Sequence, residues 1–192
     1  ARVMTPSRFT ARPTGSGGRR LRVGFVSKFL KDHTVGHLTA GLILSLPTDR
    51  YETIVFHLGS AGGPVADRLH AGCSHHVELP LAVEPAATAI ANACLDVLVY
   101  PDIGMEPITL SLSYLRLAPR QLVLWGHPVT TGSSALDGFV SSRLCEPTGA
   151  QAHYTEPLLE LPLLPGILTP PSLDGPTPTR AEFHLPPHGP IY

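Results

Sequence analysis

Short apolar runs alternate with longer stretches of mixed character from residue 21 onward, and Gly or Pro separates many of them. Apolar runs of about four to eight residues predict strands, whereas longer stretches with helical spacing predict helices. This pattern predicts strands at 21–27, 51–58, 76–79, 95–100, 121–125 and 139–142, and helices at 34–46, 64–71, 84–94 and 108–117. Such an alternation is typical of an α/β fold with a parallel sheet and helices on both faces.

The two ends of the sequence differ in composition from the middle. Residues 1–20 contain no acidic residue, a Gly-Ser-Gly-Gly segment and five arginines, and we expect a flexible basic linker there. Residues 166–192 are rich in proline and predict an extended connector. The α/β unit is therefore assigned to residues 21–165. Because the sequence starts without methionine and ends where a strand could begin, we expect a piece of a longer protein.

Composition narrows the class of protein. The chain has 192 residues, 43% of them hydrophobic, and a net charge of -1, which predicts one globular domain and favours neither a nucleic-acid nor a membrane partner. The apolar runs are far shorter than the roughly 18 residues of a membrane span. Cys73, Cys94 and Cys145 form no C-x-x-C pair, so we expect buried, reduced thiols of an intracellular protein and no zinc ribbon.

Polar residues follow three of the predicted strands, and ligands of open α/β sheets bind at such carboxyl ends. After the fifth strand comes Trp125-Gly126-His127-Pro128-Val129-Thr130-Thr131-Gly132, where a glycine permits close approach and threonines offer hydrogen bonds to hydroxyl or phosphate oxygens. After the fourth strand, Asp102 and Glu106 offer carboxyl oxygens, with simple turn formation as the alternative. Each segment alone is weakly specific.

The first strand leads into Asp32-His33-Thr34-Val35-Gly36-His37, at the start of a predicted helix. A helix N-terminus attracts anionic groups and favours a neutral histidine able to accept a proton. The alternative is structural, with His37 packed and hydrogen-bonded beneath the helix. No H-E-x-x-H pattern is present, so no metal is expected.

Taken together and in order, several segments resemble one family of enzymes. They are Arg22-Val23-Gly24-Phe25-Val26-Ser27, Asp32-His33-x-x-x-His37-Leu38, Leu95-Asp96-Val97-Leu98-Val99, Arg116-Leu117-Ala118-Pro119-Arg120-Gln121, the Gly126-His127-Pro128 turn, Glu146-Pro147 and His153-Tyr154-Thr155-Glu156. This set resembles the catalytic region of the O-GlcNAc transferase/SPINDLY family (glycosyltransferase family 41) over about residues 21–165. The ordered set is far more specific than any single motif.

The resemblance implies a Rossmann-like N-terminal lobe of a GT-B glycosyltransferase. In the family, a C-terminal lobe supplies most contacts to the nucleotide, including a lysine beside the phosphates, and tetratricopeptide repeats lie upstream. Members transfer N-acetylglucosamine, or fucose in some SPINDLY proteins, from a nucleotide sugar to Ser/Thr hydroxyls of intracellular proteins in the cytoplasm or nucleus. Configuration inverts, and neither metal nor cofactor is required. The expected donor is UDP-GlcNAc, and the isolated lobe is expected to be inactive.

Family roles transfer to matching positions. The resemblance implies that His33 lies at the catalytic centre, and the expected substrate-binding residues are His37, Asp102, Gly104, Gly126, His127, Pro128, Thr130 and Thr131. Two departures bear on sugar choice: His127 replaces a common tyrosine, and Tyr100-Pro101-Asp102-Ile103-Gly104 replaces a more usual Asn-Gly or Thr-Gly strand end. The alternatives are a non-catalytic scaffold lobe and an unrelated nucleotide-binding α/β domain.

Overall fold

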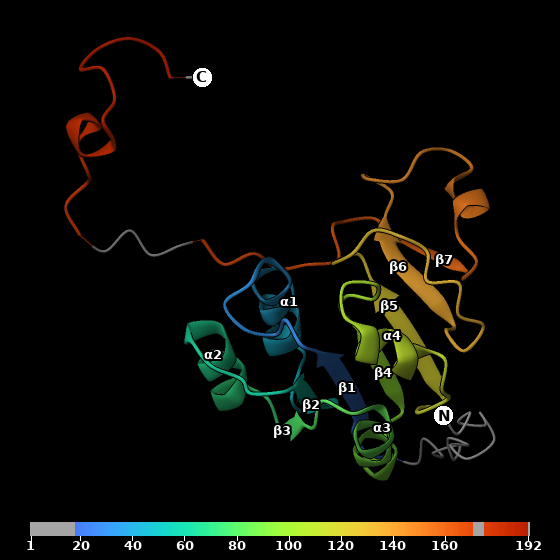
Figure 1. Ribbon diagram of the computed structural model, residues 1–192. Helices are drawn as coiled ribbons and strands as arrows, with labels where there is room; N and C mark the ends of the chain where they lie inside the picture. The colour runs from blue at the N-terminus through green and yellow to red at the C-terminus, as the bar shows by residue number, and fades with distance from the viewer. Residues whose placement is uncertain (1–17, 171–174, 192) are drawn as a thin grey trace.

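The computed structural model describes residues 18–170 and 175–191 (Figure 1). Seven strands and four α-helices alternate along most of its length. The strands are β1 (Leu21–Ser27), β2 (Tyr51–Leu58), β3 (His75–Leu79), β4 (Val97–Tyr100), β5 (Arg120–Leu124), β6 (Gly138–Ser142) and β7 (Leu158–Leu161). The helices are α1 (Thr34–Ser45), α2 (Pro64–Gly72), α3 (Val83–Asn92) and α4 (Pro107–Ser113), with short 3₁₀ helices η2 (Ala150–His153) and η3 (Arg180–Phe183).

The strands form one parallel sheet in the order β3-β2-β1-β4-β5-β6-β7. The chain builds outward from β1 through β2 to β3, then returns to the other side of β1 and continues from β4 to β7. The direction of winding therefore reverses between β1 and β4, which is the place where open α/β sheets bind ligands. The predicted Rossmann-like α/β fold is confirmed.

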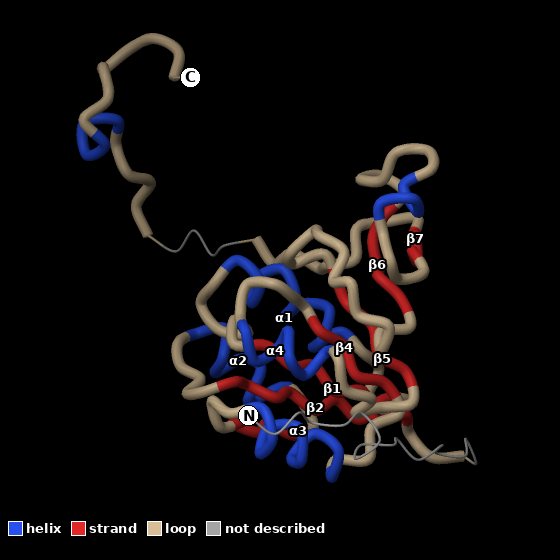
Figure 2. The backbone as a smooth tube through the Cα atoms, turned by 45° about the vertical axis from the view of Figure 1, so that its right-hand side comes forward, coloured by secondary structure: helices blue, strands red, loops and turns tan. Residues whose placement is uncertain are grey.

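Helices lie on both faces of the central part of the sheet, as Figure 2 shows, whereas β6 and β7 extend beyond them. Helices α1 and α2 bury Ile43 and Leu69 against one face, together with Phe25 of β1. Helices α3 and α4 bury Ile90 and Leu112 against the other face. Because successive side chains of a strand point to opposite faces, the central strands contribute to both cores and are apolar along their length.

Several predicted boundaries were wrong at helix and strand ends. Predicted helix 84–94 ends at Asn92, since Cys94 takes a positive φ of 49° that a helix does not allow. The fourth strand begins at Val97 rather than at residue 95; just before it, the carboxylate of Asp96 accepts hydrogen bonds from Arg19 and from the backbone N–H of Arg22. Helix 108–117 is shorter than predicted and runs from Pro107 to Ser113.

One strand was missed and one expectation about cysteine was wrong. The edge strand β7 has only four residues, and Leu159 and Leu161 are exposed, so it lacks the apolar run that marks buried strands. Cys73 is half-buried, while Cys94 and Cys145 are exposed, rather than buried as expected. All three are free thiols.

The predicted basic linker falls mainly on residues 1–17, which lie outside the described residues. Arg19 forms an ion pair with Asp96 at 2.6 Å, next to the start of β1. The predicted connector contains η3. Its first residues pack against α1, where a Cβ on Gly41 would lie 1.9 Å from the carbonyl oxygen of Ile167. Across the described ranges, no helix is long and apolar enough to cross a membrane.

Candidate active site

Three neighbouring strand ends carry the polar residues that the sequence singled out. The loops after β1, β4 and β5 hold His33, Asp102 and His127 respectively, and these strands are adjacent in the sheet. Since the strands are parallel, all three loops leave the same edge. The candidate site therefore lies at this edge, where the winding of the sheet reverses.

Asp102 is the buried centre of this arrangement, with no exposed surface. Its Oδ1 accepts a 2.5 Å hydrogen bond from the hydroxyl of Ser27, and the Ser27 oxygen accepts one from the Phe29 N–H at 2.8 Å. Among the described residues, Oδ2 of Asp102 has no hydrogen-bond partner. The side chain thus joins β1 to β4 beneath the site and keeps one acceptor atom unused.

Burial raises the pKa of the Asp102 carboxyl to about 6. The hydrogen bond from Ser27 opposes that rise, as do the charges of His33 and His127, while Glu106 adds to it. Asp102 therefore interacts electrostatically with both imidazoles, although neither forms a hydrogen bond with it in the described part of the chain.

His33 caps the N-terminus of α1. Its backbone is extended, with φ of -153° and ψ of 154°, and its Nδ1 accepts a 3.2 Å hydrogen bond from the Val35 N–H. The Phe29 ring lies against the imidazole, with centroids 4.6 Å apart and planes tilted by 31°. These two contacts fix the ring and direct its Nδ1 edge toward the helix.

His37 lies one turn further along α1 and points to solvent. Its Nε2 is 2.7 Å from Oδ1 of Asp32, and both side chains are more than half exposed. The structural alternative for this residue, packing beneath the helix, is wrong.

Close backbone packing places His127. The Gly126 N–H donates to the carbonyl of Pro101 at 3.0 Å, and a Cβ on Gly126 would lie 2.4 Å from that oxygen. Gly104, with φ of 110°, lies beneath the imidazole: a Cβ there would be 2.8 Å from Cδ2 of His127. Two glycines thus let the β4 and β5 loops touch, while Pro128 is exposed at the turn.

Thr130 and Thr131 are anchored by a carboxylate that sequence reasoning did not single out as a site residue. Glu156, 1% exposed, accepts hydrogen bonds from both hydroxyls and from the Thr131 N–H at 2.9 Å. Burial works to raise its pKa, but the hydrogen bonds from Thr131 and Thr130 together hold it below the usual value. Both hydroxyl hydrogens are therefore engaged within the protein.

Glu106 and Ser27 support the loops without lying among the residues expected to bind substrate. Glu106 caps α4, accepting from the N–H groups of Ile108 and Thr109 at 2.7 and 2.8 Å, in agreement with the turn-forming role. Ser27 was missed as a partner of Asp102. Its signal was its position: a polar residue that follows the apolar segment 23–26 and ends the strand just before the loop.

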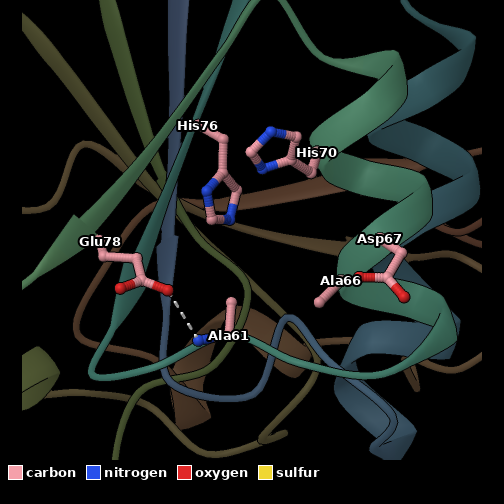
Figure 3. A pocket seen from close by; sticks show the side chains of 6 residues that line it. All are labelled: Ala61, Ala66, Asp67, His70, His76 and Glu78. Carbon is pink, nitrogen blue, oxygen red and sulfur yellow. Dashed lines mark hydrogen bonds between the residues drawn. The ribbon is translucent and has the colours of Figure 1, made fainter.

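A hollow of about 280 Å³ lies away from these loops, between α2 and β3 (Figure 3). The rings of His70 and His76 face one another there at 5.0 Å, and Glu78 accepts a 3.2 Å hydrogen bond from the Ala61 N–H. No predicted site residue lines this hollow. Across residues 18–170 and 175–191, no cluster of three or more His, Cys, Asp or Glu is arranged to hold a metal ion.

Known proteins with similar sequences are glycosyltransferases. The sequence profile of glycosyl transferase family 41 matches residues 3–164. A UDP-N-acetylglucosamine–peptide N-acetylglucosaminyltransferase of Caenorhabditis elegans is 26% identical over 161 residues, 82% of this chain and 14% of the relative. A UDP-glucose:protein N-β-glucosyltransferase of Actinobacillus pleuropneumoniae is 35% identical over 79 residues, 38% of this chain and 12% of the relative.

A solved structure is similar as well. The Thermobaculum terrenum O-GlcNAc transferase mutant K341M matches with a TM-score of 0.73 and 25% identity, covering 90% of this chain and 35% of that one. The chain thus spans only a minor part of the length of its relatives. The resemblance drawn from the ordered motifs is confirmed by the profile match over most of the sequence: the chain belongs to glycosyl transferase family 41, the O-GlcNAc transferase/SPINDLY family.

Proposed function

We propose that the chain is the N-terminal lobe of a GT-B protein O-glycosyltransferase. The intact protein would transfer a sugar, with N-acetylglucosamine from UDP-GlcNAc as the first candidate, to Ser/Thr hydroxyls of cytoplasmic proteins. The observation that carries this proposal is the meeting of His33, Asp102 and His127 at adjacent strand ends in a chain of family 41. Nucleotide sugars are ligands that such an edge suits.

In this proposal each loop has a separate task. His33 contacts the donor at the reacting centre, and His127 contacts the donor sugar above Gly104. The loop of Thr130 and Thr131, held by Glu156, keeps the third wall of the site in place. The protein would position the acceptor hydroxyl and stabilise the leaving diphosphate with N–H groups and cationic side chains, and no metal ion would take part.

Two further segments complete the proposed protein. A second Rossmann-like lobe downstream would supply most contacts to the nucleotide, and tetratricopeptide repeats upstream would recruit acceptor proteins. The 192-residue chain alone would then lack activity. The short share of each relative that it spans supports this arrangement.

A second candidate is transfer of glucose from UDP-glucose to a protein nitrogen. The observation that favours it is the 35% identity to an N-β-glucosyltransferase over 79 residues, 38% of this chain. O-fucosylation, as in some SPINDLY proteins, is a third candidate, and a non-catalytic scaffold lobe is a fourth.

The test is transfer by the intact protein from radiolabelled UDP-GlcNAc, UDP-glucose and GDP-fucose to a protein mixture, followed by mass spectrometry of the modified side chain. GlcNAc on Ser/Thr is expected, whereas glucose on a side-chain nitrogen would establish the second candidate. His127→Tyr is expected to change the ratio of sugars used. His153→Tyr makes the same change at an exposed position of η2 and serves as the control. Absence of transfer from every donor would favour the scaffold lobe.

A further inference from the structure

We propose that His33 serves the site as a hydrogen-bond donor, through Nε2–H, to an oxygen atom of the bound nucleotide sugar, and does not accept the proton of the acceptor hydroxyl. The identity of the ligand rests on the proposed function. The state of the ring rests only on its contacts within the chain.

The cap of α1 determines which nitrogen of His33 carries the hydrogen. Nδ1 of His33 accepts the Val35 N–H at 3.2 Å, so this nitrogen presents a lone pair to the helix. A neutral imidazole carries one N–H, which must then lie on Nε2. A protonated Nε2 has no lone pair available, and therefore it donates rather than accepts.

The opposite arrangement is unfavourable in this position. A general base acting through Nε2 needs its hydrogen on Nδ1, where it would meet the N–H of Val35 and break the cap. A cationic ring has the same conflict and also lies at the positive end of α1. The helix thus selects one tautomer before any ligand binds.

The remaining neighbours orient the ring without changing this choice. Phe29 lies against it at 4.6 Å, which fixes the direction of Nε2. Asp102, whose charge attracts a cation on His33, makes its hydrogen bond with Ser27, and within the described residues none joins it to the imidazole. On its own loop Asp32 is paired with His37, at 2.7 Å, and His127, on the β5 loop, acts on Asp102 through its charge alone.

The direct test is ¹⁵N NMR of the intact protein labelled at histidine, near neutral pH. The free protein is expected to give His33 signals of a protonated Nε2 and an unprotonated Nδ1. Addition of UDP-GlcNAc or UDP-glucose is expected to move the Nε2 signal without moving the proton. A proton on Nδ1, or on both nitrogens, overturns the proposal.

Two amide variants provide the second test. Asn at position 33 keeps an oxygen where Nδ1 accepts the Val35 N–H but has no group in place of Nε2. Gln reaches the position of Nε2 with an N–H. His33→Asn is expected to lower kcat/KM on the order of 100-fold, as loss of a positioned donor does, with His33→Gln retaining more activity. Equal loss in both variants, together with loss of the acidic limb of the pH profile, would instead indicate a base.

These readouts separate the inference from the proposed function. If no nucleotide sugar is bound or used, the proposed function fails, while the tautomer in the free protein still decides the state of the ring. If transfer occurs but Nε2 is unprotonated, the inference alone fails.

Discussion

The hydroxyl of Ser27 donates a 2.5 Å hydrogen bond to the buried carboxyl of Asp102, which joins the ends of β1 and β4 where the sheet reverses direction. A buried carboxyl with one unpartnered oxygen is costly to ionise. The same carboxyl that joins the two strand ends therefore makes the stability of the folded chain depend on pH.

Asp102 is expected to make stability fall as pH rises. Its pKa is raised from 3.8 to about 6 in the folded chain, so the native state binds more protons than the unfolded state between about pH 4 and 6. Relative to Asp102→Asn, the wild type should lose roughly 2 to 3 kcal/mol of unfolding free energy across this window. Urea unfolding at several pH values measures the difference.

Asp32→Asn is the control for that experiment, because Asp32 is exposed and pairs with His37, which is exposed as well. It should retain the same loss of stability with pH as the wild type. Parallel pH curves for Asp102→Asn and the wild type would contradict the role given to the buried carboxyl.

The cap of α1 should be measurable as stability. His33→Ala removes the acceptor for the Val35 N–H and is expected to cost about 1 kcal/mol, whereas His33→Asn, a strong capping residue, should stay close to wild type. Thermal or urea unfolding distinguishes the two variants. Equal destabilisation would mean that the cap contributes nothing.

Gly126→Ala should disturb the contact between the β4 and β5 loops. The new Cβ would lie 2.4 Å from the Pro101 carbonyl oxygen, so the backbone must move and His127 with it. We expect a loss of about 1 to 3 kcal/mol in unfolding free energy. Gly62→Ala, with no atom within 4 Å of its added Cβ and no positive φ, is the control and should leave the unfolding free energy nearly unchanged. An equal loss in Gly62→Ala and Gly126→Ala would argue against the clash.

Glu156→Gln should release the loop of Thr130 and Thr131. The neutral amide cannot accept all three hydrogen bonds that the carboxylate accepts. A hydrogen bond to a charged group contributes about 1.5 to 3 kcal/mol, so we expect the unfolding free energy to fall by about 2 kcal/mol or more. Faster amide exchange at Thr131 is the local readout. Glu160→Gln, on exposed β7, should change neither quantity.

The fold was accessible from the sequence because its central strands are buried on both faces. Continuous apolar runs such as Leu98 and Val99 mark strands that helices cover on either side, and the intervening helices fix a parallel order. The edge strand β7 was not accessible, since its leucines face solvent and its pairing with β6 depends on tertiary contact. Helix ends were also mispredicted. The end of α3 depends on the positive φ of Cys94, which its residue type does not predict.

The candidate site was predictable in position but not in its internal bonding. Strand ends, glycines and the family resemblance pointed to His33, Asp102 and His127. The partnership of Asp102 with Ser27 joins residues 75 positions apart, and Glu156 lies 25 positions from Thr131. Such pairs are set by strand order and register, which local sequence patterns do not encode.

The anchoring of Thr131 by Glu156 also sets the extent of the unit that can be cut from the chain without losing the site. Glu156 lies after β6, between η2 and β7. The segment that leads into the outermost strand therefore holds the loop that follows β5 in place. A domain boundary drawn at Ser142, where the last strand predicted from sequence ends, would remove that anchor. A fragment that keeps the loop of Thr130 and Thr131 anchored has to extend at least through Glu156.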